Sequence, residues 1–186
     1  PQRGVWNYFP DAVIFADETS VKRHPEYAAA KTGDVGAAKR LAAAFASRVA
    51  TSALEGLLAR RPVRFVPVHA IESRGINRIP AAFAELLGER LNLEVETGIV
   101  QANVAGHTGA TGWERLARPA IFAGDVRAGR EYLLVDDFAG QGGTLAKLRG
   151  CLKPSGVRST GAATLTRKIY SAKLALQAYS LDTLRA

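Results

Sequence analysis

Tyr132-Leu-Leu-Val-Asp-Asp-Phe-Ala-Gly-Gln-Gly-Gly-Thr144 is the stretch of this sequence that decides the fold. Its first four residues are apolar and predict a buried strand, which we expect Asp136 and Asp137 to end. The glycine-rich residues 138–143 predict a tight turn. A helix is expected to begin at Thr144 and to end at Pro154.

The order of these elements predicts a binding site as well as a fold. Ligands of open α/β sheets bind outside the carboxyl ends of the strands. A glycine turn exposes backbone N–H groups, and a helix N-terminus adds a positive partial charge, so together they favour phosphate. Two adjacent carboxylates repel phosphate but accept hydrogen bonds from sugar hydroxyls. The stretch therefore predicts a ribose 5-phosphate site, with a plain strand–helix turn as the structural alternative.

Strands and helices alternate along the rest of the chain. One long amphipathic helix is expected from Asp34, as its N-cap, to Arg60, and another from about Ile79. Loops are expected at 70–77 and 98–118, and a short helix within 172–186. Further strands are predicted at residues 12–16, 63–69, 93–97 and 157–166.

This alternation predicts an α/β fold with a central, mainly parallel sheet flanked by helices. We expect residues 62–186 to form the core, and residues 1–61 to form a hood or appendage of one strand and helices.

Composition narrows the class of protein. A chain of 186 residues suits one domain, or one domain with a small appendage. With 47% apolar and 23% charged residues, it is neither disordered, collagen-like nor a coiled coil. Its apolar runs are shorter than the roughly 20 residues of a membrane span, and no signal-peptide pattern is present, so we expect a cytoplasmic protein with no membrane partner. A single cysteine, Cys151, excludes an internal disulfide and a cysteine-based metal cluster.

The positive charge is concentrated near one end of the sequence. The formal net charge is +8, and residues 138–186 hold eight basic residues against one acid. Such asymmetry favours a surface that faces phosphate or a polyanion, nucleic acid included. A solvated basic face is the alternative that the sequence leaves open.

The stretch 132–144 resembles the phosphoribosyl pyrophosphate motif of type I phosphoribosyltransferases. The resemblance implies that family's fold, with a variable hood over the site. It also implies that Asp136 and Asp137 hold the ribose 2- and 3-hydroxyls. The 5-phosphate would be wrapped by the loop residues Ala139, Gly140, Gln141, Gly142, Gly143 and Thr144.

The sequence departs from the family pattern at Gly140-Gln141. The family usually has two hydroxyl residues there, or an acid followed by a hydroxyl residue. The departure makes 6-oxopurine salvage a less favoured role and leaves open whether catalysis is retained.

Two further segments are similar to the ComF-type branch of the family, which is associated with DNA uptake and predicted amidophosphoribosyltransferases. Val66-Pro-Val-His-Ala followed by Ser73-Arg-Gly-Ile-Asn-Arg78 matches its strand and Arg-Gly-X-Asn loop. The resemblance makes Arg74 and Gly75 the pyrophosphate-binding pair. Residues 100–118 occupy the place of a hood that closes over the substrate, from which Arg115 and Arg118 would reach pyrophosphate.

The resemblance implies an enzyme that transfers the phosphoribosyl group of phosphoribosyl pyrophosphate to a nitrogen nucleophile and releases pyrophosphate. Arg74, Asp136 and Asp137 would be its catalytic residues. Mg²⁺ would be held by ligand oxygens near the two aspartates rather than directly by side chains. A homodimer is the expectation for this family.

The alternative is a non-catalytic binding or regulatory protein of the same fold, associated with nucleic acid. Three side chains of the N-terminal segment, those of His24, Tyr27 and Lys31, are better explained as helix surface than as an acceptor pocket. Arg167 and Lys168 follow the last predicted strand, where family members often contact base or phosphate.

Overall fold

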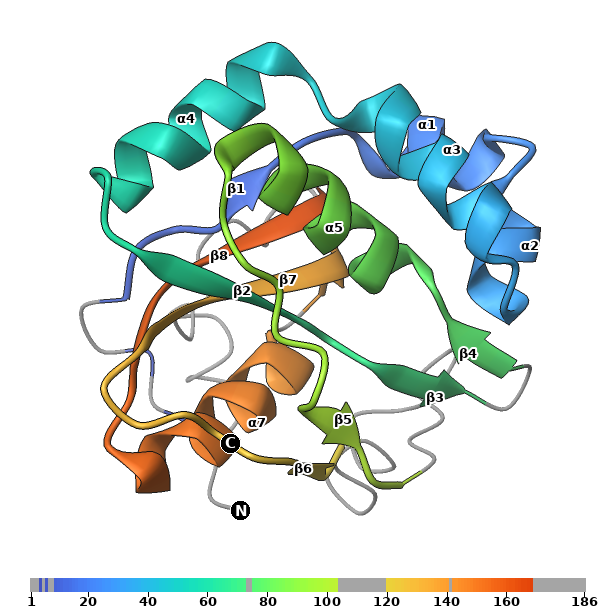
Figure 1. Ribbon diagram of the computed structural model, residues 1–186. Coiled ribbons are helices and arrows are strands. Elements are labelled where there is room, and N and C mark those ends of the chain that lie inside the picture. The colour runs from blue at the N-terminus through green and yellow to red at the C-terminus, as the bar shows by residue number, and fades with distance from the viewer. Residues whose placement is uncertain are drawn as a thin grey trace, which may run out of the picture.

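A parallel sheet of four strands forms the centre of the molecule in the computed structural model, which describes residues 4, 6, 9–72, 75–103, 120–140 and 142–168. The strand order is β1-β8-β7-β2, and all three pairings are parallel. The strands are β1 (Val13–Ile14), β2 (Val63–Pro67), β7 (Glu131–Ala139) and β8 (Arg158–Arg167). The predicted α/β class with a parallel sheet is confirmed (Figure 1).

Helices cover both faces of this sheet. One face packs against α1 (Glu18–Arg23), α2 (Tyr27–Thr32), α3 (Val35–Phe45), α4 (Arg48–Leu58) and α5 (Ile79–Leu91), while α7 (Gly143–Leu152) lies on the other (Figure 1). A 3₁₀ turn, η1 (Lys153–Ser155), follows α7 at Pro154, where the sequence predicts the helix to end.

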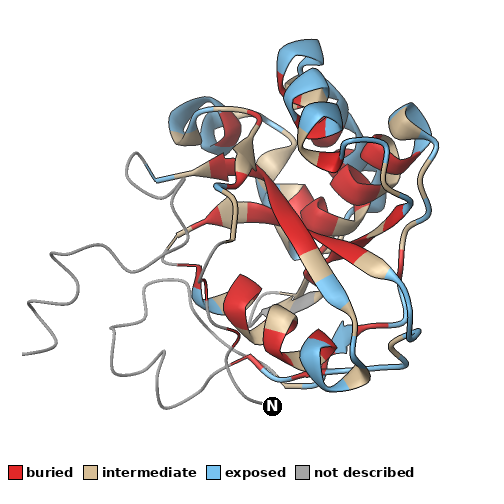
Figure 2. Ribbon diagram, turned by 90° about the vertical axis from the view of Figure 1, so that its left-hand side faces the viewer, coloured by how far each residue is buried: buried red, intermediate tan, exposed pale blue. Residues whose placement is uncertain are grey.

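Alternation along β7 divides its side chains between two cores. Leu133 and Val135 belong to the core beneath α1–α5, and Tyr132 and Leu134 belong to the core around α7. A strand with both faces covered is largely buried, and residues 132–137 of β7 are all buried within a sheet whose strands are mostly buried (Figure 2).

Two short antiparallel strand pairs involve segments near the predicted loops, one within 70–77 and one that joins residues 100–101 to 122–123. Most of the loop predicted at 98–118 and the short helix predicted within 172–186 lie outside the described residues. Strands β3 (Ala70–Glu72) and β4 (Gly75–Asn77) pair antiparallel, as do β5 (Val100–Gln101) and β6 (Phe122–Ala123). Both are too short to carry a periodic signal. The strand predicted at 93–97 is reduced to one parallel bridge between Phe65 and Val95.

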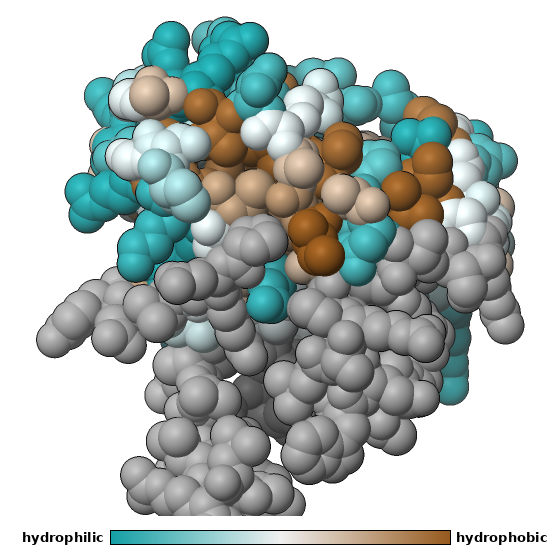
Figure 3. Space-filling model, turned by 90° about the horizontal axis from the view of Figure 1, so that it is seen from below, coloured by the Kyte–Doolittle hydropathy of each residue, from teal (hydrophilic) through white to brown (hydrophobic). Residues whose placement is uncertain are grey.

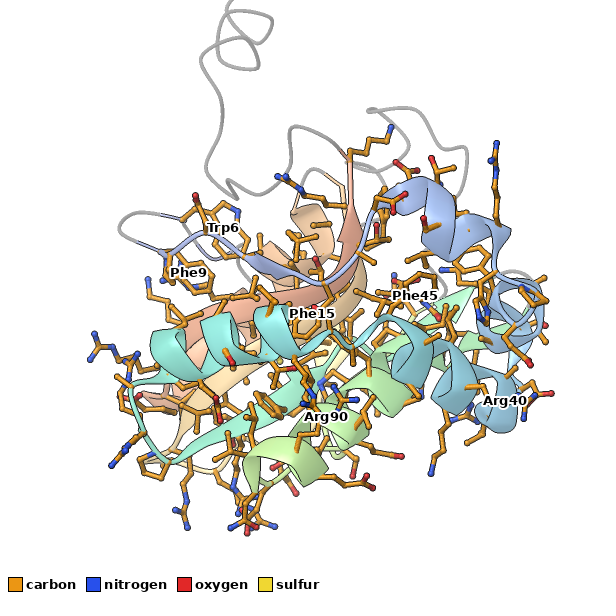
Figure 4. The ribbon with its side chains drawn as sticks, turned by 90° about the horizontal axis from the view of Figure 1, so that it is seen from above. Trp6, Phe9, Phe15, Arg40, Phe45 and Arg90 are labelled. Carbon is orange, nitrogen blue, oxygen red and sulfur yellow. The ribbon has the colours of Figure 1, made fainter. Side chains whose placement is uncertain are left out.

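The single helix predicted from Asp34 to Arg60 is wrong. It is two helices, α3 and α4, which are bent by 87° at the break between them. Asp34 caps α3 as predicted, but Ser47 caps α4 by accepting a hydrogen bond from the Ala50 N–H at 3.2 Å. From α5, the Arg90 guanidinium donates to the Ala46 carbonyl at the break (Figure 4).

The packing explains why periodicity suggested one helix. Leu41 and Leu54 are buried as that pattern requires, but Val49, which continues it, is 83% exposed. The regular spacing of apolar residues therefore continues across the break between α3 and α4, although these residues do not lie on one face of a single helix.

The N-terminal strand β1 forms one edge of the central sheet. β1 pairs with β8 in the register Val13 with Ala163 and Ile14 with Thr164. The ring of Phe15 meets that of Phe83 edge to face, with 4.8 Å between centroids (Figure 4). The predicted boundary between residues 61 and 62 stays a prediction.

No single helix in the described ranges is long and apolar enough to cross a membrane, although α3 and α4 together meet the length and composition criteria.

Two large hydrophobic residues near the pair β5–β6 are exposed. Val100 in β5 is 37% exposed and Ile121 beside β6 is 41% exposed. Figure 3 shows hydrophobic residues reaching the surface on the side seen from below.

The helix break gives a first prediction. Ser47→Ala removes the α4 cap and should lower the free energy of unfolding by about 1 kcal/mol, as cap deletions commonly do. Ser52→Ala, at an exposed position inside α4, should have no effect or a slightly stabilising one because alanine is the better helix former. Urea unfolding followed by circular dichroism measures both. Equal effects would contradict a helix start at Ser47.

Candidate functional site

Two adjacent carboxyl groups are buried at the carboxyl edge of the sheet. Asp136 and Asp137 are 6% and 7% exposed. The sequence predicts that they end their strand, but β7 continues through them to Ala139, because the pairing with β8 extends to Arg167. They are therefore held by the strand pairing with β8 rather than by a loop.

Asp137 meets a cation from a distant part of the chain. The Lys31 ammonium group, on α2, lies 3.1 Å from the Asp137 carboxylate. The Asn77 side chain, on β4, hydrogen-bonds to the same carboxylate, and its own oxygen accepts from the Ile79 N–H at 3.2 Å. Elements α2, β4 and β7 thus converge on one carboxyl group.

The two carboxyl groups differ in their protonation. Burial raises the pKa of Asp136 well above its ordinary value, and the neighbouring charge of Asp137 raises it further. Burial also acts to raise the pKa of Asp137, but the charge of Lys31 and the hydrogen bonds from Asp136, Lys31 and Asn77 outweigh it and hold that pKa low. Between these two pKa values the pair holds one proton, and Asp136 is the member that carries it.

Two threonines of β8 lie across the ladder from β7, and one of them is opposite Asp136. Thr164 pairs with Asp136 across the ladder, and Thr166 pairs with Phe138. Both threonines are buried, and in the described part of the chain neither hydroxyl has a hydrogen-bond partner. Buried polar groups are normally satisfied, so these hydroxyls mark a place where polar ligand atoms or water belong.

The N-terminus of α7 begins just after the acid pair. Gly142 occupies the cap position with a φ of 68°, which favours glycine, and no side chain caps the helix. Among the described residues, a Cβ built on Gly143 has no heavy atom within 4 Å. A helix N-terminus without a side-chain cap leaves first-turn N–H groups available to an anion.

The hairpin β3–β4 is fixed against α2. The Arg78 N–H donates to the Ala30 carbonyl at 3.1 Å. At Gly75, whose φ is 134°, an added Cβ would lie 2.6 Å from the Thr32 carbonyl oxygen. Packing alone therefore requires this glycine, whether or not it also contacts a ligand.

The structure brings together only some of the residues that the sequence singles out. Asp136, Asp137, Ala139, Gly140 and the start of α7, including Thr144, form one contiguous segment. The Lys168 N–H donates to the Ala139 carbonyl at 3.1 Å, which places Lys168 beside that segment. Arg74, Arg115, Arg118 and Gln141 lie outside the described residues.

Sequence reasoning undervalued the contribution of α2. Lys31 was expected on a helix surface, yet it contacts the acid pair. Asn77 stands in the Arg-Gly-X-Asn loop singled out in the sequence, but it was given no role at the site. The two threonines were missed because no local pattern distinguishes a polar side chain aimed at a site from one aimed at solvent. A lysine next to alanines in a short helix carries no such signal either.

The donor set fits a metal carried by a ligand better than a resident metal. In the described ranges, no group of three or more histidine, cysteine or acidic side chains is arranged to hold a metal ion. The acid pair keeps one proton and faces one ammonium group, so it offers little net charge to a cation. Mg²⁺ prefers substrate oxygens and retained waters, which suits this arrangement.

Comparison with known proteins finds two sequence relatives. The chain is 41% identical over 165 residues to Protein TraN of Escherichia coli, a match that covers 89% of this chain and 37% of that protein. It is 37% identical over 142 residues to an uncharacterized protein of Haemophilus influenzae, covering 76% of this chain and 32% of that one. The chain thus spans about a third of the length of these curated relatives. No family model matches it.

Among solved structures, the chain is similar to adenine phosphoribosyltransferase from Saccharomyces cerevisiae complexed with an iminoaltritol bisphosphate and adenine. The TM-score is 0.49 and the sequence identity is 15%, with 82% of this chain and 76% of that chain covered.

Replacing each aspartate of the acid pair by asparagine should change the stability of the chain in opposite directions. Because the pKa of Asp136 is raised in the folded chain, Asp136 lowers the free energy of unfolding increasingly as pH rises above the ordinary carboxyl range. Asp136→Asn keeps the side-chain oxygen that accepts from the Asp137 N–H at 2.8 Å and removes that cost. At pH 8 it should raise Tm by about 2–4 °C, which corresponds to about 1 kcal/mol for a chain of this size.

Asp137→Asn should do the reverse. The lowered pKa of Asp137 contributes stability above the ordinary carboxyl range and loses it as pH falls, so this variant should be less stable than wild type at pH 8. Both differences should shrink toward pH 3.5, because the carboxyl groups then become protonated in the unfolded chain. Thermal unfolding across this pH range measures them. Equal signs for the two variants would contradict the assignment of the proton to Asp136.

Proposed function

We propose that this chain binds phosphoribosyl pyrophosphate and acts as a phosphoribosyltransferase. The observation that carries the proposal is the buried acid pair followed directly by the uncapped, glycine-opened N-terminus of α7. A ribose 5-phosphate needs a diol site and a phosphate site a few residues apart, and this segment supplies both. The resemblance of residues 132–144 to the phosphoribosyl pyrophosphate motif agrees with this geometry.

In this proposal each part of the ligand has its place. The ribose hydroxyls bind Asp136 and Asp137, and the 5-phosphate binds the amides that open α7. The pyrophosphate binds Arg74 and Gly75 at the hairpin, with Arg115 closing over it. Mg²⁺ arrives with the pyrophosphate and ribose oxygens.

The proposed reaction forms a bond from a nitrogen nucleophile to the ribose C1 and breaks the bond from C1 to the pyrophosphate oxygen. The nitrogen loses a proton, and pyrophosphate leaves with its negative charge. The chain would contribute mainly by holding the ligand and by stabilising the departing charge. The finer assignment to the ComF-type branch rests on the sequence resemblance of residues 66–70, 73–78 and 113–122, and the relatives found carry other names.

A non-catalytic ribose-phosphate binding protein is the second candidate. Gly140-Gln141 replaces the side chains that the family usually places in this loop, and the C-terminal residues concentrate positive charge. Tight binding of phosphoribosyl pyrophosphate with no turnover of any nitrogen acceptor would favour this candidate. A nucleic-acid role would add an affinity for DNA or RNA that falls steeply with salt.

A thermal shift assay tests the proposed ligand. Phosphoribosyl pyrophosphate with Mg²⁺, at about 100 times its Kd, should stabilise the wild type by about 2.7 kcal/mol, which is several degrees in Tm. The double variant Asp136→Asn/Asp137→Asn should lose that shift. No shift in the wild type would overturn the proposal, because the ligand would then not bind the folded chain.

The proposed phosphate site can be tested by adding a single methyl group at Gly143. Gly143→Ala adds a methyl group where the ligand-free structure has space, so Tm should stay the same or rise, while affinity for ribose 5-phosphate should fall at least about tenfold, or ~1.4 kcal/mol. Gly56→Ala is the matched control, since Gly56 lies in α4 and its added Cβ also meets nothing within 4 Å. It should leave the affinity unchanged. Equal affinities of the two variants, measured by calorimetry, would place the phosphate elsewhere.

A further inference from the structure

Lys31 contacts Asp137, and the residues before and after Lys31 in α2 are both held by the hairpin β3–β4 and its C-terminal end. Its side chain is 21% exposed and that of Asp137 is 10% exposed, with 3.1 Å between the ammonium nitrogen and the carboxylate oxygen. The carbonyl of the preceding residue, Ala30, accepts from Arg78, and the following residue, Thr32, packs against Gly75. The hairpin therefore fixes the backbone from which Lys31 reaches the site.

The groups that face the acid pair come from three elements. Helix α2 supplies the Lys31 ammonium group, β4 supplies the Asn77 amide, and β8 supplies the Thr164 and Thr166 hydroxyls. Lys31 is the cation that acts on both carboxyl groups.

Several charged side chains on the other packed helices have partners of their own. On α5, Glu85 pairs with Lys39 and Arg90 donates to the Ala46 carbonyl. On α1, the Lys22 ammonium group pairs with Glu18 and lies 5.1 Å from the centroid of the Phe138 ring. On α7, Arg149 donates to the Ser159 hydroxyl.

On the basis of the proposed function, we propose that Lys31 is the positioning residue of the diol site. Its ammonium group fixes Asp137 as the hydrogen-bond acceptor and leaves Asp136 as the partner that donates, so each ribose hydroxyl meets a defined carboxyl group. This assigns a binding role to residues 1–61 that no motif in the sequence indicates.

The hydrogen-bonding groups of the acid pair explain how it would bind a diol. A carboxylate only accepts hydrogen bonds, whereas a protonated carboxyl group also donates one. Two carboxylates would force both ligand hydroxyls to donate into adjacent negative charges. One donor and one acceptor instead match a diol in which one hydroxyl donates and its neighbour accepts.

The prediction concerns the pH range of binding. Without Lys31, Asp137 loses the charge that keeps it ionised, so it should become protonated at a higher pH. A nearby opposite charge commonly lowers a carboxyl pKa by about 1–3 units. In Lys31→Met, binding of ribose 5-phosphate should therefore be lost on acidification about one pH unit or more earlier than in the wild type.

Calorimetry with ribose 5-phosphate from pH 4.5 to 8.5 measures the profiles of the wild type, Lys31→Met, Lys31→Arg and Lys39→Met. The ligand phosphate titrates identically with all four proteins, so differences between profiles report the protein. Lys31→Arg should restore the wild-type profile because it keeps the cation. Lys39→Met removes the same charge from an exposed site on α3 and should leave the profile unchanged.

The outcomes separate this inference from the function on which it rests. The assignment is supported if Lys31→Met loses affinity for ribose 5-phosphate at a higher pH than the wild type on acidification, and if Lys31→Arg restores the wild-type pH. An unchanged profile, or an equal loss of affinity at every pH, overturns it while the proposed function stands. Failure of the wild type to bind at any pH overturns both.

A ligand-free measurement covers the case in which Lys31→Met does not fold. Carbon NMR of the aspartate carboxyl groups in the wild type should show Asp137 titrating below the ordinary range of an aspartate and Asp136 titrating well above it. The reverse order, or two ordinary titrations, would overturn the assignment without any variant.

Discussion

The burial of two adjacent carboxyl groups on a central strand is the constraint on which the rest of the site depends. Side chains alternate along β7, and Asp136 and Asp137 follow four apolar residues that pack on both faces of the sheet. Two buried negative charges side by side are unfavourable in an interior of low polarity. The chain resolves this by bringing Lys31 and Asn77 to Asp137, while burial and the neighbouring carboxyl group raise the pKa of Asp136.

That resolution ties together parts of the chain that are far apart in sequence. Lys31 comes from α2, Asn77 from β4 and the unsatisfied threonine hydroxyls from β8. The hairpin β3–β4 packs on the C-terminal turn of α2, so the cation and the amide are held in one frame. A site that is polar, buried and incompletely satisfied is costly to maintain, which is typical of a binding site rather than of a structural core.

The sequence predicted the local parts of this arrangement well. The apolar run, the acid pair and the glycine turn before α7 lie within 13 residues, so their spacing alone predicted a strand, a turn and a helix start. Sequence reasoning failed where a structural feature depends on a single residue or on a contact with a distant part of the chain. Ser47 divides the predicted long helix, the pairing with β8 extends β7 past Asp137, and Lys31 reaches the site from α2. None of these contacts leaves a periodic pattern in the sequence.

The measurement that tests the central claim most directly is a titration of the isotope-labelled chain with ribose 5-phosphate, followed by amide NMR. We predict that the largest shifts fall on the amides of Asp137 and Gly140 and on the first turn of α7, at Gly142, Gly143 and Thr144. Shifts confined to other parts of the molecule, or none at saturating ligand, would contradict the account, because the acid pair and the helix N-terminus would then not form one binding site.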